Sequence, residues 1–359
     1  MHVPDGFIDA PTSAATGVLA AGALAVSLRG ARRELDERTA PLAGLVAAFI
    51  FAVQMLNFPV AAGTSGHLLG GALAAILVGP CTGVLCVSVV LLMQGILFAD
   101  GGLTALGVNI TDMAVVTTVV SYAVFRGLVK VLPRRRRSVT VASFVAALVS
   151  VPAAAVAFTL IYAVGGTTDV AISKVATAMI GVHVLIGIGE ATITALTVGA
   201  VIAVRPDLVY GARGLEQKLK LRVNGQLVDA PGAEPAVPVA AARPQALVSA
   251  RAGRYPHHRK LWVTGLVTSL LLAGFVSFYA SASPDGLEKV AKDQGIDRRT
   301  EPHATADSPL ADYGVKDIAD ARLSGGLAGV IGVGVTLVAG SAVFWAVRRR
   351  RTAEPSRAS

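Results

Sequence analysis

Eight apolar stretches separated by polar segments dominate the hydrophobic pattern of this chain. They occupy residues 11–28, 40–57, 68–98, 113–132, 139–164, 175–204, 261–281 and 325–347. A helix needs about 20 mostly apolar residues to cross a bilayer, and most of these stretches approach or exceed that length. The pattern therefore predicts an integral membrane protein whose spanning elements are helices.

Clusters of basic residues set the expected orientation of these helices. Arginines follow the first stretch and form runs at 134–137 and 348–351. Lys and Arg beside membrane spans mark the cytoplasmic side, so we expect Met1 outside and the C-terminus in the cytoplasm. On this assignment residues 68–98 begin and end outside and must cross twice. Their break is expected at Gly79-Pro80, because proline interrupts a helix.

The spans divide into two blocks with a polar segment between them. We predict an all-α integral membrane fold, with a seven-helix bundle followed by a two-helix domain and about nine transmembrane helices in total. The expected domains are residues 1–210 and 259–350. Residues 211–258 form a cytoplasmic linker, because their centre is rich in Ala, Pro and Val. The loop at 281–324, expected outside, holds nine acidic and six basic residues.

Composition agrees with a membrane protein and excludes several function classes. The chain is 53% hydrophobic and 15% charged, against about 25% charged in soluble domains. The net charge of +9 does not indicate nucleic acid, because the basic residues lie beside apolar spans. The two cysteines, Cys81 and Cys86, lie in an apolar run and are expected to pack there. The sequence has no G-x-x-x-x-G-K-[ST] loop and no catalytic triad, so we expect neither an enzyme nor an ATPase.

The first two residues form a metal chelator. The α-amine of Met1, the deprotonated amide nitrogen of His2 and its imidazole Nδ1 close two fused rings in one plane, which suits Ni(II) or Cu(II). Retention of Met1 is expected because His2 is bulky, and no secretory leader precedes the first span. A Met-His start also arises by chance, so this interpretation requires a further ligand.

The candidate for the fourth in-plane nitrogen is His67. The predicted topology, which rests on the basic clusters alone, places Met1, the loop 58–67 and the segment 100–111 on one outer face. Polar side chains near this face either form hydrogen bonds around the site or link helices; they are Gln54, Asn57, Gln94 and Asn109. Ser65 and Asn109 are also candidates to support the metal ligands or to line a transport pathway.

Two ionisable residues, His183 and Glu190, lie within the stretch 175–204. They are seven positions apart and so share a helical face. Ionisable groups inside a membrane are costly and are functional candidates. Glu190 has either a functional role, in a transport pathway or at the interface with a partner, or a structural role as a buried hydrogen-bonded group of the bundle. The sequence leaves both interpretations open. An intramembrane enzyme built on this pair is disfavoured, because no nucleophile or complete metal triad accompanies it.

Four stretches of the chain resemble sequence signatures of known protein families. Residues 1–7, MHVPDGF, resemble the Met-His-Ile-Pro-Asp-Gly-Phe/Tyr start of the CbiM/NikM family, with Val3 in place of Ile. Residues 64–71, TSGHLLGG, and 183–191, HVLIGIGEA, are similar to further family stretches. Residues 283–291, SPDGLEKVA, resemble the Pro-Asp-Gly-Leu-Glu signature of the CbiN/NikN-like PDGLE domain. The chain therefore resembles a fusion of the two proteins.

The resemblance implies the substrate-specificity component of an energy-coupling-factor transporter for cobalt and nickel. It implies a metal-binding membrane domain in which Met1, His2 and His67 hold Co(II) or Ni(II) as transported substrate. It also implies a separate transmembrane coupling subunit, a pair of cytoplasmic ATPases and a multi-pass location in the bacterial cytoplasmic membrane, surrounded by lipid. Planar nitrogens favour Ni(II), and Co(II) stays open. The alternative is a membrane metal-sensing or assembly protein without transport.

Overall fold

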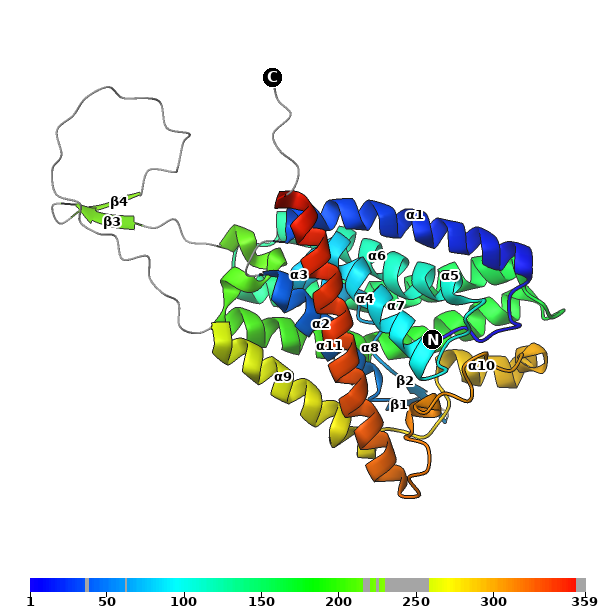
Figure 1. The fold of residues 1–359 in the computed structure, drawn as a ribbon. Coiled ribbons are helices and arrows are strands. Elements are labelled where there is room, and N and C mark those ends of the chain that lie inside the picture. Colours follow the sequence, from blue (N-terminus) through cyan, green and yellow to red (C-terminus); the bar gives the residue numbers. More distant parts are fainter. Residues whose placement is uncertain (36–38, 62, 216–219, 224–225, 230–257, 353–359) are drawn as a thin grey trace.

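The computed structural model describes residues 1–35, 39–61, 63–215, 220–223, 226–229 and 258–352. Figure 1 shows a bundle of long helices that α11 crosses obliquely. The long helices are α1 (Ala10–Glu34), α2 (Thr39–Gln54), α4 (Pro80–Leu97), α6 (Thr117–Val131), α7 (Arg136–Gly165), α8 (Ile172–Val204), α9 (His258–Gly274) and α11 (Ala321–Thr352).

Short elements connect these helices. The helical ones are α3 (Gly71–Val78), α5 (Leu106–Asn109), the π-helical η1 (Ile110–Val116), α10 (Gly286–Gln294), and the 3-10 turns η2 (Pro206–Leu208), η3 (Tyr210–Leu215), η4 (Val276–Tyr279), η5 (Ile296–Arg299) and η6 (Ala311–Tyr313). Two antiparallel hairpins join β1 (Phe58–Ala61) to β2 (Thr64–Gly66), and β3 (Lys220–Val223) to β4 (Gln226–Asp229). They are the departures from the all-α prediction within the described residues. Most of the predicted linker at 211–258 lies outside those residues.

The long helices have the length and surface of membrane spans. Seven helices among the described residues are long and apolar enough to cross a bilayer, while α2, with 16 residues, and α3, with eight, are shorter. Large apolar side chains point outward from them, including Val18, Leu160 and Leu196, which are 76%, 64% and 69% exposed. Exposed apolar surface on this scale is typical of contact with lipid. The prediction of a multi-pass helical membrane protein is confirmed.

The predicted break at Gly79-Pro80 separates α3 from α4. Gly79 has a φ of +104°, which favours glycine, and a Cβ there would lie 2.6 Å from Glu34 Oε2. The Glu34 carboxylate accepts hydrogen bonds from the backbone N–H groups of Cys81 and Thr82, at 3.1 and 2.7 Å, and so caps α4. The two halves are unequal, with eight residues in α3 and 18 in α4, because the chain enters α3 only at Gly71.

The next span begins earlier than the sequence predicted. We expected a loop at 100–111 and a helix from Met113, whereas the helical conformation starts at Leu106 and continues through η1 into α6. Asp112 lies in the π-helical turn, and its two carboxylate oxygens have no hydrogen-bond partner among the described residues. The polar segment therefore lies partly inside the bundle, and it carries Asn109 there.

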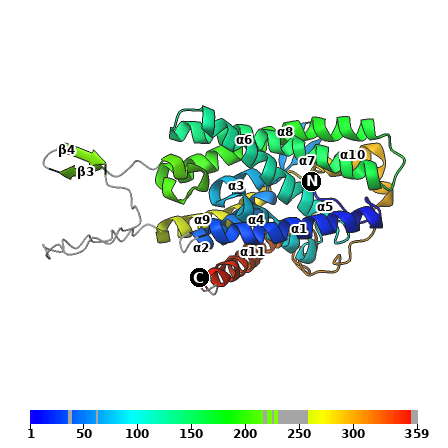
Figure 2. The same cartoon turned by 90° about the horizontal axis from the view of Figure 1, so that it is seen from above.

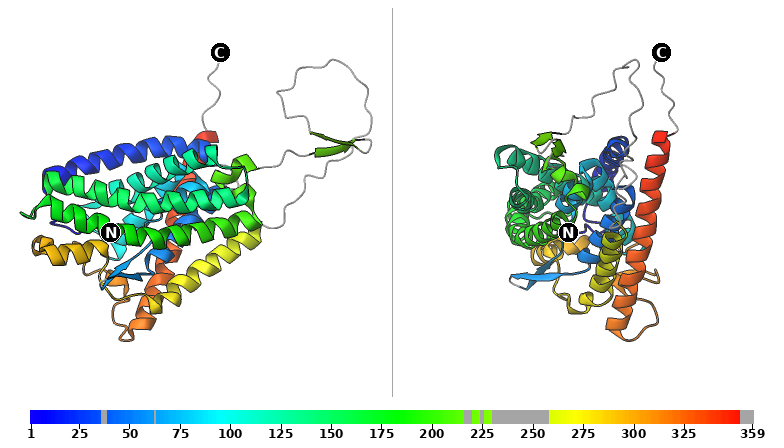
Figure 3. Two further views of the ribbon diagram at one scale, coloured as in Figure 1. Left: turned by 180° about the vertical axis from the view of Figure 1, so that it is seen from behind. Right: turned by 90° about the vertical axis from the view of Figure 1, so that its left-hand side faces the viewer.

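The second domain contacts the first along its length. The helices α9 and α11 pack on α2, where a Cβ at Gly44 would lie 2.4 Å from Ser341 Oγ. Between these two helices the chain forms a loop that contains α10. In Figures 2 and 3, α10 lies beside the N-terminus at one end of the bundle. The 281–324 loop therefore covers the end of the bundle where the predicted metal ligands are found.

Candidate metal centre

Most of the first seven residues are buried among the helices. Met1 is 3% exposed, His2 8%, Val3 0% and Phe7 2%. Asn109 fixes this segment, because its Oδ1 accepts from Val3 N at 2.7 Å and its Nδ2 donates to Val3 O at 3.1 Å. Val3 O also accepts from the backbone N–H of Gly102 at 2.8 Å. The terminus is thus held at a defined depth, and Asn109 lies next to the site as expected.

The turn after His2 connects both domains. The Asp5 carboxylate accepts from Thr104 N at 2.8 Å, and Asp5 O accepts from the Glu301 N–H at 3.0 Å. Gly6 has a φ of +88°, and a Cβ there would lie 2.1 Å from Arg299 O. Only glycine permits this approach. The conformation of the terminal segment therefore depends on a close contact with the second domain.

The hydrogen bonds of His67 leave its Nε2 lone pair facing the terminus. His67 Nδ1 lies 3.0 Å from Leu68 O, which can only accept, so Nδ1 carries the hydrogen in the neutral ring. His67 Nε2 lies 2.6 Å from the α-amine nitrogen of Met1. Two nitrogens bound at right angles to one metal, with bonds of about 2.0 Å, are about 2.8 Å apart. The pair therefore has the spacing of neighbouring ligands.

A chain of side-chain amides fixes the tautomer of His2. Gln54 Nε2 donates to Leu69 O at 3.0 Å, and Gln94 Nε2 donates to Gln54 Oε1 at 2.9 Å. Gln94 Oε1 is then the acceptor for His2 Nε2–H, at 3.0 Å. The sequence left open whether these amides surround the site or link helices, and they do both. His2 Nδ1 is left with a lone pair, which is the nitrogen that the chelate requires.

The surroundings of His2 favour a cation. Asp100 Oδ1 lies 3.3 Å from His2 Nδ1, so two acceptors face each other when the ring is neutral. Burial lowers the pKa of His2 to about 4, although Asp100 acts in the opposite direction. The ring is therefore neutral at physiological pH, and a metal ion at Nδ1 would also be attracted by Asp100. The His2 and His67 rings stack with centroids 5.2 Å apart.

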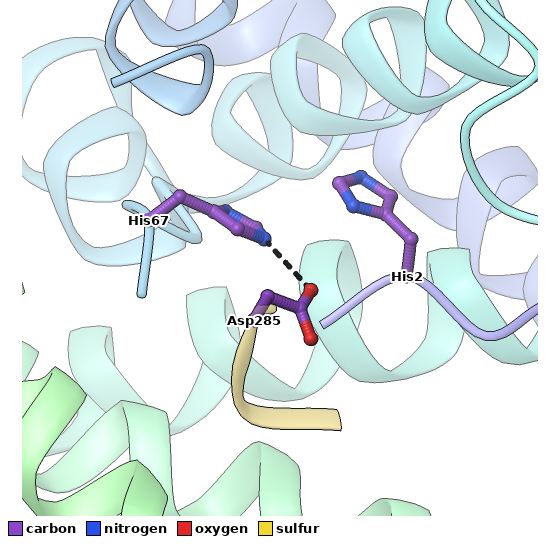
Figure 4. Close-up of side chains that lie close together, drawn as sticks. All are labelled: His2, His67 and Asp285. Carbon is purple, nitrogen blue, oxygen red and sulfur yellow. Dashed lines mark ion pairs between the residues drawn. The ribbon is translucent and has the colours of Figure 1, made fainter. Parts of the chain in front are cut away.

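A carboxylate of the second domain completes this cluster. Asp285 Oδ2 lies 2.8 Å from the Met1 α-amine nitrogen and 3.6 Å from His67 Nε2 (Figure 4). Burial raises the pKa of Asp285, but the attraction of the α-ammonium group and His67 outweighs it and holds this pKa well below its usual range. In the described residues, His2, His67 and Asp285 form the one group of three side chains placed to hold a metal ion. The sequence interpretation missed Asp285 and Asp100, and the only signal for Asp285 was the motif at 283–291.

The hydrogen bonds of Ser65, Glu190 and His183 go to backbone groups and not to the Met1 amine. Ser65 donates to Ser283 O at 2.7 Å and so anchors the second domain. Glu190 accepts from Leu69 N at 2.7 Å and from Gly70 N at 3.1 Å, which places it as a support for the segment after His67. His183 Nδ1 bonds Met179 O at 2.7 Å, while its Nε2 has no partner among the described residues.

A cavity of about 560 Å³ adjoins the cluster. It is lined by residues of both domains, among them His2, His67, Asp285, Asp100 and Tyr313. The space lies between the bundle and the 281–324 loop, so an ion can approach the two imidazoles from this side. The geometry as a whole offers several nitrogen donors, nearby carboxylates and a route of approach.

Comparisons with known proteins agree with this architecture. Residues 2–208 match the family described as the cobalt uptake substrate-specific transmembrane region, and residues 259–349 match the PDGLE domain. The fused nickel transport protein NikMN of Rhodobacter capsulatus is 44% identical over 125 residues, which cover 35% of this chain and 36% of that protein. The cobalt transport protein CbiM of Sorangium cellulosum is 33% identical over 217 residues, which cover 58% of this chain and 94% of that protein.

One solved structure provides an independent match. The crystal structure of a transition metal transporter aligns with a TM-score of 0.50 and 28% identity, covering 57% of this chain and 93% of that one. Together these matches indicate a component of cobalt or nickel transport rather than an enzyme. The match at 2–208 spans more than half of the chain. The chain therefore belongs to the cobalt uptake substrate-specific transmembrane family, and it carries a PDGLE domain at its C-terminal end.

Proposed function

We propose that this protein captures Ni(II) or Co(II) for an ATP-driven importer of the energy-coupling-factor type. The observation that carries the proposal is the convergence of the Met1 α-amine with two buried imidazoles whose hydrogen bonds leave lone pairs on His2 Nδ1 and His67 Nε2. Histidine ligands are held in this way by their outer hydrogen bonds at metal sites. The metal is the transported substrate.

The proposed ligands are four nitrogens. They are the Met1 amine, the His2 amide nitrogen, His2 Nδ1 and His67 Nε2. The His2 amide N–H donates to no acceptor among the described residues, so its removal breaks no hydrogen bond there. Asn109 holds the next peptide group and thereby orients the amide, while Glu190 supports the backbone after His67. Ser65 and His183 lie around the site without a proposed bond to the metal.

Nickel is the favoured substrate of the two. A planar set of nitrogens suits Ni(II), and affinity generally rises from Co(II) to Ni(II). The Rhodobacter capsulatus relative, named as a fused nickel transport protein, supports this choice. The relatives named as cobalt transport proteins keep Co(II) as the second candidate.

Import requires partners that the chain does not supply. The sequence has no nucleotide-binding loop, so we propose a separate transmembrane coupling subunit and two cytoplasmic ATPases in the bacterial cytoplasmic membrane. In this proposal residues 1–210 bind the metal, 211–258 link the domains in the cytoplasm and 259–350 form the PDGLE domain. A metal sensor or assembly protein without transport would bind the ion equally well. Uptake that depends on the partners distinguishes the two.

Moving the α-amine away from His2 tests whether the amine is a metal ligand. We would insert Lys-Glu-Lys between Met1 and His2, because three residues move the amine out of chelating reach. A single inserted residue is unsuitable, since amine, two amides and imidazole would then form a different four-nitrogen chelate. The matched control carries the same three residues after Ser359. Ni(II) and Co(II) binding would be titrated in detergent against a competing chelator.

We expect the insertion to weaken nickel binding by roughly a hundredfold or more, because losing a direct ligand should cost at least as much as losing its supporting hydrogen bond. The control should bind as the unmodified protein does. Equal affinity in the insertion variant would refute the terminal chelate. Radiolabelled nickel uptake, with and without the partner subunits, then tests transport; uptake that is independent of them would refute the coupled mechanism.

A further inference from the structure

Asp285 uses its two carboxylate oxygens for different purposes. Oδ1 accepts from Glu288 N at 2.9 Å, and Glu288 Oε2 accepts from Asp285 N at 2.9 Å. This reciprocal pair is a capping box, and it fixes Asp285 at the start of α10. Oδ2 takes no part in the cap and points at the terminus, as Figure 4 shows for its approach to His67. Oδ1 therefore stabilises the start of α10, whereas Oδ2 is directed at the candidate metal site.

Packing against the first domain holds Asp285 in place. Ser65 binds the two preceding carbonyl groups, through its hydroxyl to Ser283 O at 2.7 Å and its N–H to Pro284 O at 2.8 Å. On the other side, a Cβ at Gly286 would lie 2.8 Å from Ile186 Cδ1. Leu287 follows and is fully buried. The carboxylate is therefore presented by a docked helix, which gives a ligand its precision.

The position of Oδ2 suits a ligand above the plane of nitrogens. It lies 2.8 Å from the Met1 nitrogen and 3.6 Å from His67 Nε2, and these two nitrogens are 2.6 Å apart. An ion bonded to both nitrogens at about 2.0 Å can also lie within bonding distance of Oδ2. Nitrogens take the four in-plane positions of the proposed chelate, so the position left for Oδ2 is apical.

Charge leads to the same conclusion. In the metal-free site Oδ2 pairs with the α-ammonium group. When the amine binds a metal it has no charge, so Asp285 would remain as a buried carboxylate without its partner. A buried charge that loses its partner is strongly destabilising, and the incoming divalent cation is the replacement that restores the balance.

We propose that Asp285 Oδ2 is an apical oxygen ligand of the transported metal ion, so that the PDGLE domain completes the coordination sphere formed by the first domain. This inference rests on the proposed function, because it assumes that the four nitrogens bind the ion. It makes the second domain part of the site and not only a neighbour of it. The loaded site is then five-coordinate, with four nitrogens and one carboxylate oxygen.

Asp285→Asn is the test variant. Asparagine caps helices as well as aspartate does, so α10 is retained while the anionic ligand is removed. Asp285→Ser provides a second capping residue, whose shorter side chain cannot reach the ion. The matched control is Asp293→Asn, which lies in the same helix on the surface and pairs with Lys289. Each protein would be checked for folding by size-exclusion chromatography and thermal denaturation in detergent.

The readout is spectroscopic. Cu(II) would be bound in place of the native ion and followed by electron paramagnetic resonance, which responds to an axial oxygen. Ni(II) would be followed by absorption and magnetic susceptibility, because four planar nitrogens give a diamagnetic ion and an added axial ligand favours a paramagnetic one. We expect both Asp285 variants to show a four-nitrogen planar site and to bind Ni(II) about tenfold more weakly. Asp293→Asn should match the wild type.

Two different results distinguish a failure of this inference from a failure of the proposed function. Identical spectra for wild type and both folded Asp285 variants would remove Asp285 from the coordination sphere and leave the four-nitrogen site intact. If the His67→Ala variant has the same metal spectrum as the wild type, the proposed four-nitrogen site is wrong, and this inference fails with it.

Discussion

Replacing Asn109 with alanine should loosen the N-terminal segment without removing any proposed ligand. The side chain makes two hydrogen bonds to Val3, at 2.7 and 3.1 Å, and both residues are almost completely buried. In the variant the Val3 N–H loses its acceptor. Val3 O keeps one donor, because Gly102 N lies 2.8 Å away.

The expected cost follows from these contacts. A buried N–H without a partner costs about 1–3 kcal/mol, and the second, partly replaced bond adds about 0.5–1.5 kcal/mol. The docked conformation should therefore lose about 1.5–4.5 kcal/mol of free energy relative to local opening. Because about 1.4 kcal/mol corresponds to a factor of ten, the open population should rise roughly 10- to 2000-fold.

Hydrogen–deuterium exchange of the peptide containing residues 1–8 measures this opening directly. Protection there should fall by the factor above, while α7 and α8 exchange as before. Asn57→Ala is the control, because Asn57 also lines the cavity but its Oδ1 has no partner among the described residues. Unchanged protection in Asn109→Ala would refute the argument that this amide holds the terminus.

Three further predictions follow from single contacts. Because burial lowers the pKa of His2 from 6.5 to about 4, metal-free protein should lose up to about 3 kcal/mol of stability as pH falls through that range, and His2→Gln should lack this slope in thermal denaturation. Gly6→Ala should lower the melting temperature more than Gly63→Ala; both positions have positive φ, but only at Gly6 does a Cβ meet the second domain. Glu190→Gln should weaken Ni(II) binding by about tenfold with an unchanged metal spectrum, because it supports the segment after His67 and is not a ligand.

Hydropathy predicted the helical membrane fold, and local conformation was harder to predict. An apolar run can be recognised from the local sequence alone, so the membrane spans were predicted even where the predicted ends were wrong. The unequal split at Gly79 depends on Glu34, which caps α4 from more than 40 residues away in the sequence. The early start at Leu106 and the hairpin before His67 likewise depend on contacts between distant segments.

The same distinction applies to the site. The structure brings Met1, His2 and His67 together, as the sequence interpretation required, and the bond of each to a metal stays a prediction. Asp285 was not predicted as a ligand, because it is one of nine acidic residues in its loop and its motif at 283–291 indicates a domain and not a metal site. The docking of the loop on the first domain, with Ser65 as one contact, places it at the amine. Glu190, for which the sequence left two roles open, has the hydrogen bonds of a structural support.

Charge balance connects the two proposals and leads to a further measurable quantity. In the metal-free site, the α-ammonium group of Met1 and the side-chain carboxylate of Asp285 form a pair with no net charge. With a divalent ion bound, the deprotonated His2 amide and the Asp285 carboxylate again balance the charge. Keeping both states neutral requires one proton to leave the amine and one to leave the amide, because each imidazole binds the ion through the ring nitrogen that carries no hydrogen.

We therefore expect about two protons to be released for each ion bound near neutral pH. Isothermal titration of Ni(II) in buffers with different ionisation enthalpies measures this number. His67→Ala is the informative comparison, because His67 binds the ion through a nitrogen that carries no hydrogen. The variant should bind Ni(II) more weakly but release the same number of protons for each ion bound. Release of a single proton would mean that the His2 amide keeps its hydrogen, and the planar chelate would then be wrong even if Met1 and both histidines bind the ion.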